Sequence, residues 1–301
     1  MISIIIPFFN EEQNIVPLVK EIEGVMKPLN LGYEVIFVND GSTDKSVSFV
    51  KKECEQSENI HLFGHKKRLG KGEALQTGIT NSSGEIIIFM DGDLQDDPHD
   101  IPHFLKKIDE GALFVNGVRK IRKDNSIIRF YSGLVNGLLK KFMASPFTDI
   151  NCGFKAFKRE ILTDIPLYGN NFRFLPLAAF YKGYGVTQIE VSNRPRIHGV
   201  SKFGISKLLI GIFDTLTAYF LFRFSQNPLH FFGTIGAVAF GLGFIISFYL
   251  AIERIFFNVL LYRRPLLQLG IVLIIVGIQI IMTGIIGELI VYLHKQNQNQ
   301  N

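Results

Sequence analysis

The sequence predicts an α/β domain with a mostly parallel sheet, followed by amphipathic juxtamembrane helices and a C-terminal hairpin of two transmembrane helices. In the first 120 residues, short apolar segments alternate with amphipathic ones, which is typical of a parallel sheet covered on both faces by helices. Residues 228–301 carry only 4 basic and 2 acidic side chains, whereas residues 1–227 carry 28 and 25. The last quarter of the 301-residue chain is therefore suited to a membrane.

The expected elements of the first domain follow one another in regular alternation. Strands are expected where apolar, β-branched residues run together, at Ser3–Ile6, Tyr33–Val38, Ile60–Phe63, Glu85–Met90 and Leu113–Val115. Helices are expected where apolar residues recur at helical spacing, at Glu11–Lys27, Asp44–Gln56, Gly72–Thr80 and Asp100–Glu110. Ligands bind at the carboxyl ends of strands in such sheets, so the polar residues that follow each strand are the candidates for function.

A basic, amphipathic region follows this alternation. Seven Lys and Arg residues stand against one Asp between Arg119 and Lys141, and the apolar residues among them predict a helix on a membrane surface over residues 126–144. A second helix of this kind is expected at Phe203–Phe224, in a juxtamembrane segment spanning residues 201–227. The alternative for both is an ordinary core helix. The first domain is expected to comprise residues 1–200, with the helix at 126–144 included.

Two uncharged runs, Leu229–Ile252 and Pro265–Gly287, contain 24 and 23 residues. A bilayer core about 30 Å thick needs about 20 residues of helix, so we expect transmembrane helices at residues 229–252 and 266–290. This excludes a purely soluble enzyme and a disordered chain, and two cysteines exclude a disulfide-stapled secreted module. The net charge of +5 is too small to indicate a nucleic-acid partner.

The chain start, MISIIIPFFNEE, reads as a buried strand and not as a signal peptide. The predicted topology is therefore multi-pass in the plasma or inner membrane, with the catalytic domain and both termini cytosolic. The loop between the two membrane helices carries Arg254, Arg263 and Arg264 against Glu253, which is more positive than an outside loop usually is. Two membrane helices with a short loop could also support a homo-oligomer.

The strongest chemical motif is MDGDLQDDP, directly after an apolar strand. Asp91 and Asp93 make a hard oxygen site suited to Mg²⁺ or Mn²⁺, which binds through one or two carboxylates together with substrate phosphates. Gln95 could add a neutral oxygen ligand. The alternative is a polar strand-to-helix turn, but the position after a buried strand favours a metal site.

Three further strand ends or helix starts are polar. In VNDGSTD, Asp40 could accept hydrogen bonds from a base or a ribose; the alternative for this motif is that Asp44 or Ser42 merely caps the following helix. In IPFFNEE, Pro7, Asn10 and Glu11 form either a turn under a nucleotide or, for Asn10, a helix cap. In RLGKGEALQTG, Lys71 opens a helix whose backbone N–H groups favour an anion.

In this order and spacing, IPFFNEE, VNDGSTD, GKGEALQTG and MDGDLQ resemble the family 2 glycosyltransferases of the GT-A fold over residues 1–200. The DLQ extension, the basic stretch after VNGVRK and the membrane pair resemble the polyprenyl-phosphate branch, of the dolichol-phosphate mannose synthase and bactoprenol glucosyltransferase type. DINCGFKAFKRE and RPRIHGVSKF match two later blocks of that branch. The resemblance implies a metal-dependent, inverting transfer of one hexose from a nucleotide-diphosphate sugar to a polyprenyl phosphate.

The resemblance also implies roles for individual residues. Asp40 would contact the nucleotide, Asp91 would lie by the ribose and diphosphate, and Asp93 and Gln95 would hold the metal. The implied contacts of acceptor or donor phosphate are Arg119, Arg129, Ser132, Arg196, Ser201 and Lys202. Among nucleotide sugars, a UDP-hexose is favoured over GDP-mannose.

One departure from the wider family narrows the reaction. Processive polysaccharide synthases carry a Gln-x-x-Arg-Trp motif, and this chain has no tryptophan, so a single transfer is favoured. A lipid phosphate with a second pKa of about 6 is mostly a dianion at cytosolic pH and needs no strong base. Asp149 could orient a reactant, act as a base, or pair with a nearby Arg or Lys. The alternatives are another glycolipid acceptor, or a non-catalytic scaffold that binds nucleotide sugar.

Overall fold

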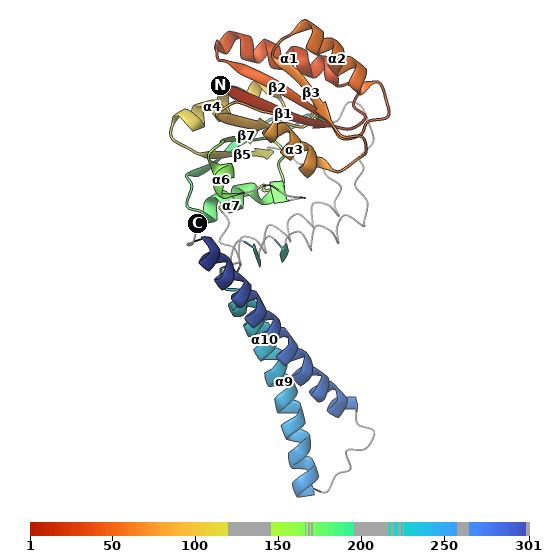
Figure 1. Cartoon of the computed structure of the whole chain (residues 1–301), viewed down its shortest axis with the longest axis vertical. Coiled ribbons are helices and arrows are strands. Elements are labelled where there is room, and N and C mark those ends of the chain that lie inside the picture. Colours follow the sequence, from red (N-terminus) through yellow and green to blue (C-terminus); the bar gives the residue numbers. More distant parts are fainter. Residues whose placement is uncertain are drawn as a thin grey trace. The chain divides into compact units, whose positions relative to one another are not determined.

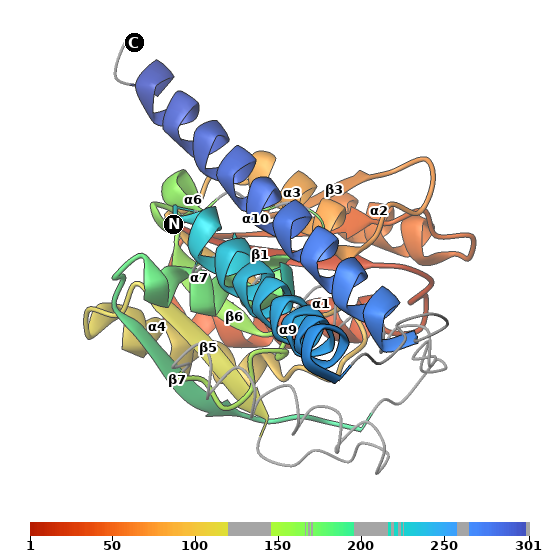
Figure 2. The ribbon, with the colours of Figure 1, turned by 90° about the horizontal axis from the view of Figure 1, so that it is seen from below.

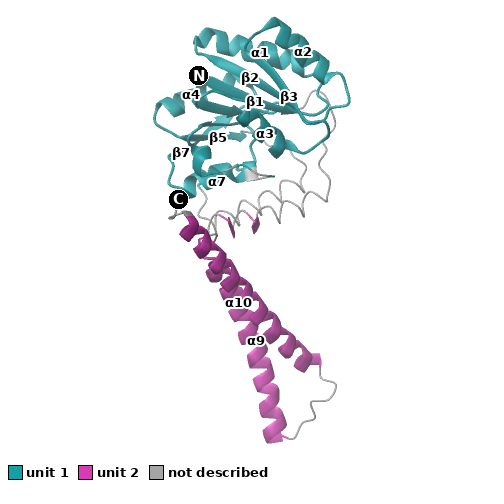
Figure 3. Cartoon of the chain, viewed as in Figure 1, with its two compact units in different colours: residues 1–215 teal, residues 216–301 magenta. Residues whose placement is uncertain are grey.

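The computed structural model describes residues 1–119, 146–165, 167, 169, 171–195, 216–217, 220–221, 224, 226–257 and 265–298. The expected surface helix at 126–144, with Arg129 and Ser132, lies outside these residues. So do the loop with Arg196, Ser201 and Lys202, most of the expected helix at 203–224, and Arg263 and Arg264 of the hairpin loop. The chain divides into two compact units, Met1–Thr215 and Leu216–Asn301 (Figure 3).

The first unit is built on one mixed sheet. Its seven strands are β1 (Ile2–Phe8), β2 (Tyr33–Asn39), β3 (Ile60–Gly64), β4 (Ile86–Phe89), β5 (Phe114–Arg119), β6 (Lys155–Lys158) and β7 (Val186–Val191). They lie in the order β3-β2-β1-β4-β6-β5-β7, and only β6 runs antiparallel to its neighbours. The predicted mostly parallel α/β fold is confirmed. Strands β6 and β7 were not among the predicted elements.

Helices cover both faces of this sheet (Figure 1). The helices are α1 (Ile15–Leu29), α2 (Ser46–Gln56), α3 (Lys71–Thr80), α4 (Ile101–Asp109), α6 (Ile161–Asp164) and α7 (Leu175–Tyr181), with the short 3-10 helices η1 (Pro98–Asp100) and η2 (Asn171–Phe174). Alternate residues of β1, such as Ile4 and Ile6, pack with α1 and α4, while Ile5 faces α3. A Cβ on Gly78 of α3 would lie 2.3 Å from Ile5 Cγ2, so α3 packs closely because this residue is glycine.

The parallel register places the functional loops at one edge. β1 pairs with β2 on one side, Phe8 opposite Asn39, and with β4 on the other, Ile5 opposite Phe89. The loops after these three strands therefore leave the sheet together at its carboxyl edge. Asp40 and Asp91, which directly follow Asn39 and the strand end Phe89–Met90, are brought to the same edge.

The second unit contains two long apolar helices, α9 (Pro228–Phe257) and α10 (Pro265–Gln298). By length and composition both could cross a membrane. They lie side by side in both views (Figures 1 and 2). Glu288 of α10 accepts a hydrogen bond from Leu229 N at the start of α9 (3.2 Å), so this acidic residue satisfies a backbone donor that a helix N-terminus leaves open.

Glycines let the backbones of α9 and α10 approach closely. A Cβ on Gly277 of α10 would lie 2.6 Å from Phe240 N and 2.7 Å from Gly236 O of α9, and a Cβ on Gly243 would lie 2.6 Å from Gly270 O. The outer faces carry exposed Phe and Ile, including Phe244. Small residues at the contact are what helix pairs in lipid use, because lipid removes the hydrophobic drive for association.

The close contact predicts a specific cost for Gly277→Ala. The added methyl group must displace the α9 backbone, and overpacking of this kind costs about 1–3 kcal/mol. Gly241→Ala is the matched control, because nothing lies within 4 Å of its added Cβ and both substitutions raise helix propensity equally. We expect only Gly277→Ala to lower the thermal stability of the detergent-solubilised chain, measured by circular dichroism. Equal effects of the two would contradict this packing.

Candidate active site

Asp40, at the end of β2, is buried and binds the start of α3. Its carboxylate accepts hydrogen bonds from Leu69 N (2.8 Å) and Gly70 N (3.0 and 3.1 Å). His65 Nδ1 lies 3.3 Å away and Arg68 Nε 3.8 Å away. A helix N-terminus favours an anion, and at the Leu69 and Gly70 amides that anion is the carboxylate of Asp40.

The turns after β1 and β2 are joined to each other. Asn10, with a left-handed φ of 57°, donates from its backbone to Ser42 Oγ (3.0 Å) and accepts from Thr43 N (2.8 Å). The helix-cap alternative for Asn10 is wrong, because α1 begins only at Ile15. For the same reason the predicted helix start at Glu11 is too early.

Asp44 does act at the start of α2, as one alternative expected. Its Oδ1 accepts from the backbone and side chain of Ser46, at 3.0 and 2.5 Å, and its Oδ2 accepts from Glu12 N (3.2 Å). Glu11 N donates to Ser46 Oγ (2.8 Å). The two turns therefore form one connected floor at the carboxyl edge, next to Pro7 of β1.

Asp91, at the end of β4, forms an ion pair with Lys71 of α3. Burial raises the pKa of Asp91, but the charge of Lys71 and its hydrogen bond more than offset this, and the pKa lies below its ordinary value. A Cβ on Gly153 would lie 2.8 Å from Asp91 Oδ2 and 3.1 Å from Lys71 Nζ. A side chain at position 153 would therefore force the Asp91–Lys71 pair to shift, and glycine lets the DINCGF segment lie against it.

Asp93 and Gln95 lie on a tightly turned loop. Asp93 is 9% exposed, and its Oδ1 accepts from Gln95 N (3.2 Å). Leu94 between them is buried and has a left-handed φ of 60°, an uncommon conformation for a non-glycine residue. A strained backbone that the surroundings maintain is common at functional sites, so the conformation is consistent with a ligand-binding loop.

Asp96 was not predicted as a site residue. It is 5% exposed, and its Oδ2 accepts from Asp91 N (3.0 Å). Burial, together with the carboxylates of Asp91 and Asp93, raises the pKa of Asp96 to about 7. The third acid of the DGDLQD run was visible in the sequence, but its contact with the Asp91 backbone was not.

Asp149 pairs with Arg119, which ends β5. Arg119 Nε and Nη2 donate to the two carboxylate oxygens of Asp149 at 2.8 and 3.1 Å, and Asp149 is 4% exposed. Asn116, fully buried, donates to the Asp149 backbone oxygen (2.9 Å). Pairing was one alternative for Asp149, and the structure contains that pair. A polar Asn in the middle of an apolar strand is the signal that could have pointed to Asn116.

Lys155 is a buried cation behind the same segment. It is 1% exposed, and its ammonium donates to Ile150 O (3.1 Å) and to Cys152 O. Burial lowers the pKa of Lys155 to about 8, because a low-dielectric surrounding disfavours the charged form. Lys155 thereby holds the backbone between Asp149 and Gly153.

The oxygen donors at the carboxyl edge fit a hard divalent cation. Asp93 and Gln95 offer one carboxylate and one amide oxygen from the same loop, on either side of Leu94, and Asp91 and Asp96 add nearby carboxylates. Mg²⁺ commonly uses one or two carboxylates and takes its other ligands from substrate phosphates and water. Among the described residues, a second group of possible metal ligands lies elsewhere. It consists of Glu21, Asp97 and His99, whose ligand atoms lie within 4.8 Å of one another.

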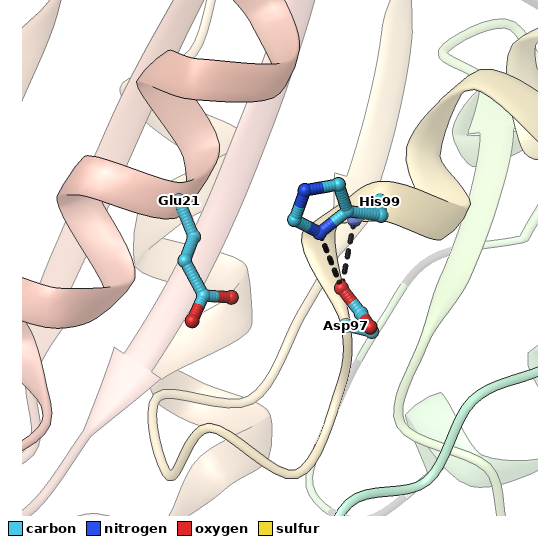
Figure 4. A group of neighbouring side chains, drawn as sticks. All are labelled: Glu21, Asp97 and His99. Carbon is cyan, nitrogen blue, oxygen red and sulfur yellow. Dashed lines mark hydrogen bonds and ion pairs between the residues drawn. The ribbon is translucent and has the colours of Figure 1, made fainter.

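That second group is neutralised by a guanidinium. Figure 4 shows Glu21 of α1 near Asp97 and His99, with His99 bonded to Asp97. Arg194 bonds to both carboxylates, through Nη1 to Glu21 (2.7 Å) and through Nη2 to Asp97 (2.7 Å). Because these oxygens already bind Arg194, the group does not offer an open cation site.

Residues 3–165 match the family model described as glycosyl transferase family 2. The chain belongs to this family. The family relatives include the dodecaprenyl-phosphate galacturonate synthase of Rhizobium johnstonii, 33% identical over 96% of this chain and 87% of that one. The undecaprenyl-phosphate 4-deoxy-4-formamido-L-arabinose transferase of Photorhabdus laumondii is 28% identical over 96% and 88%.

Solved structures share the fold. Glucosyl-3-phosphoglycerate synthase of Mycobacterium tuberculosis, in complex with Mn²⁺, UDP and glucosyl-3-phosphoglycerate, aligns with a TM-score of 0.58, 21% identity, and coverage of 73% of this chain and 79% of that one. Its complex with phosphoglyceric acid aligns with a TM-score of 0.57 at 20% identity, covering 74% and 79%. At this identity the likeness concerns the fold, and the predicted GT-A-like fold is confirmed.

The buried ammonium of Lys155 predicts a pH dependence of stability. Between about pH 8 and 10.5 the folded chain has lost this proton while the unfolded chain retains it, so the free energy of unfolding rises with pH. Relative to Lys155→Met, the unaltered chain should gain about 3 kcal/mol across this window. Chemical unfolding of the two chains at a series of pH values, followed by circular dichroism, measures the difference.

Lys158→Met is the control for this experiment. Lys158 lies on the same strand but is exposed, so its removal should leave the slope of unfolding free energy against pH unchanged. A difference between the unaltered chain and Lys155→Met that is independent of pH from 7 to 11 would contradict the burial of a titrating ammonium.

Proposed function

We propose that the chain is a membrane-bound inverting glycosyltransferase that moves one sugar from a nucleotide-diphosphate sugar to a polyprenyl phosphate. The observation that carries the proposal is the match over 96% of the chain, apolar helices included, to two relatives whose names specify polyprenyl-phosphate sugar transfer. The assembled carboxylates at the sheet edge support it independently, because a hard oxygen site beside strand ends suits a nucleotide diphosphate.

The donor would bind at the carboxyl edge of β1, β2 and β4. The joined turns with Pro7, Asn10 and Glu11 would form the floor under the nucleotide, beside Asp40. Since Asp40 binds the Leu69 and Gly70 amides, its role includes shaping the loop that the nucleotide meets. Arg68, held 4.3 Å from the Phe9 ring, belongs to the same wall.

Asp93 and Gln95 would hold Mg²⁺ or Mn²⁺, with Asp91 beside the ribose and diphosphate. When bound, the cation would neutralise charge that develops on the leaving nucleoside diphosphate. Lys71 would add positive charge at the same place, because its ammonium already lies on Asp91. These groups are oriented before the substrate arrives, which is the condition for electrostatic stabilisation of a leaving group.

On the acceptor side, Arg119 would hold the lipid phosphate in line with the anomeric carbon. Asp149 binds Arg119 through both carboxylate oxygens, and this favours orientation of the guanidinium over a role as base. A phosphate monoester with a second pKa of about 6 is already mostly the dianion at neutral pH. Arg129, Ser132, Arg196 and Lys202 remain proposed phosphate contacts.

The apolar helices α9 and α10 support a multi-pass location in the plasma or inner membrane. The catalytic unit and both termini would be cytosolic, where nucleotide sugars are made. Among donors we favour a UDP-hexose over GDP-mannose. Self-association through the membrane helices would make the protein a homo-oligomer.

The test is transfer of label into lipid. The detergent-solubilised full chain is incubated with Mn²⁺, undecaprenyl phosphate and radiolabelled UDP-glucose, UDP-galacturonate or GDP-mannose, and the organic phase is counted. We expect label in the organic phase with a UDP-sugar and about 100-fold less with Asp93→Asn, since losing a metal ligand or its support costs about this much. Asp109→Asn, an exposed acid at the end of α4, should retain full activity.

Two results would count against the proposal. Undiminished transfer in chelator would show that Asp93 and Gln95 hold no essential metal. Label incorporated only when a different glycolipid replaces undecaprenyl phosphate would move the assignment to another acceptor class.

A further inference from the structure

A segment distant in sequence binds the loop that carries Asp93 and Gln95. Residues 192–194, directly after β7, lie along residues 95–100, which follow Gln95 toward α4. Arg194 N donates to Gln95 O (2.9 Å), and Asn193 forms an antiparallel bridge with Asp96. Ser192 N donates to Asp100 Oδ2 (2.7 Å).

The side chain of Arg194 connects its own segment both to the loop, at Asp97, and to helix α1, at Glu21. Its Nη2 lies 2.7 Å from Asp97 Oδ1 and its Nε donates to Asp97 Oδ2 (3.2 Å), while Nη1 donates to both oxygens of Glu21 on α1 (2.7 and 2.9 Å). Two bidentate contacts by one guanidinium fix both its position and its orientation. Glu21 belongs to a helix that packs on the sheet, so this connection anchors the loop to the body of the domain.

The charges explain why a cation is needed at this point. Asp96, Asp97 and Asp100 follow Asp91 and Asp93 within ten residues, so the loop gathers negative charge. Arg194 lies against Asp97 and so offsets part of the repulsion among these acids.

We propose that Arg194 is a positioning residue for the metal ligands Asp93 and Gln95, acting through Asp97 and the Gln95 backbone. The inference rests on the proposed metal site and goes beyond it, since Arg194 contacts the loop through Asp97 and through the backbone of Gln95. Leu94 shows what is being held: its left-handed φ of 60° is kept only if the surroundings determine it. Residues that orient metal ligands from outside typically contribute 10–100-fold to metal affinity.

The experiment measures Mn²⁺ binding directly. The detergent-solubilised full chain is titrated with Mn²⁺ in the presence of UDP, and free Mn²⁺ is followed by electron paramagnetic resonance. We expect Arg194→Ala to weaken Mn²⁺ binding by about tenfold. Arg194→Lys keeps the charge but not the two bidentate contacts, so it should restore affinity in part. Glu21→Gln, which loosens only the anchor on α1, should weaken binding less than Arg194→Ala.

Arg159→Ala is the matched control. Arg159 is also partly buried and also ties elements together, with Nε donating to Gly84 O (2.8 Å) and Nη2 to Ser82 Oγ (2.6 Å), but at the opposite end of β4. It should lower the melting temperature without changing Mn²⁺ affinity. If Arg194→Ala lowers stability and leaves Mn²⁺ affinity equal to that of Arg159→Ala, Arg194 is merely structural and the inference is overturned.

Asp93→Asn separates this failure from failure of the metal site. Lost Mn²⁺ binding in Asp93→Asn with normal binding in Arg194→Ala would overturn only the role of Arg194. Normal Mn²⁺ binding in Asp93→Asn would overturn the metal site, and the role of Arg194 with it. Should Arg194→Ala fail to fold, the Arg194→Lys and Glu21→Gln titrations decide the question, and unaltered Mn²⁺ affinity in both overturns the inference.

Discussion

Repulsion between carboxylates at the carboxyl edge of the sheet is the constraint on which the site depends. The parallel pairing of β1 with β2 and β4 brings Asp40 and Asp91 to one edge, and Asp149 joins them from the DINCGF segment. Each acid is answered by a specific partner: Asp40 by the amides of Leu69 and Gly70, Asp91 by Lys71, Asp149 by Arg119. Buried acids are tolerated only with such partners, so the surrounding loops are shaped by the need to supply them.

The first five strands and four helices could be predicted because their signals are local. Apolar β-branched runs such as Ile86–Phe89 and helical spacing within Ile101–Asp109 are visible in short windows of sequence. Strand β6 was missed because its residues, Lys155–Lys158, include two lysines and read as polar. What makes it a strand is pairing with β4 and β5, about 70 and 40 residues earlier in the chain respectively, and such pairing leaves no local periodicity.

The residue types of the candidate site could be predicted from the sequence, but the contacts between these residues could not. A carboxylate after a buried strand is conspicuous, so the sequence singles out Asp40, Asp91 and Asp93 as candidates. Lys155 and Arg194 were given no role, since neither stands at a strand end that the sequence reveals. Arg194 meets Glu21 across 173 positions and Asp97 across 97. Contacts over such separations follow from the topology of the sheet, in particular from β7 lying at its edge.

The distribution of charge also bears on how the proposed transfer would proceed. A general base must take a proton, and protonation of Asp149 would cost the ion pair in which both of its oxygens accept from Arg119. Lys71 and Arg119 each form an ion pair with an acid at the carboxyl edge, Asp91 and Asp149 respectively. A phosphate dianion is already a nucleophile at neutral pH, so the barrier left to lower is the approach of two anions and the departure of a third. An arrangement that orients cations with carboxylates would suit that task without a general base.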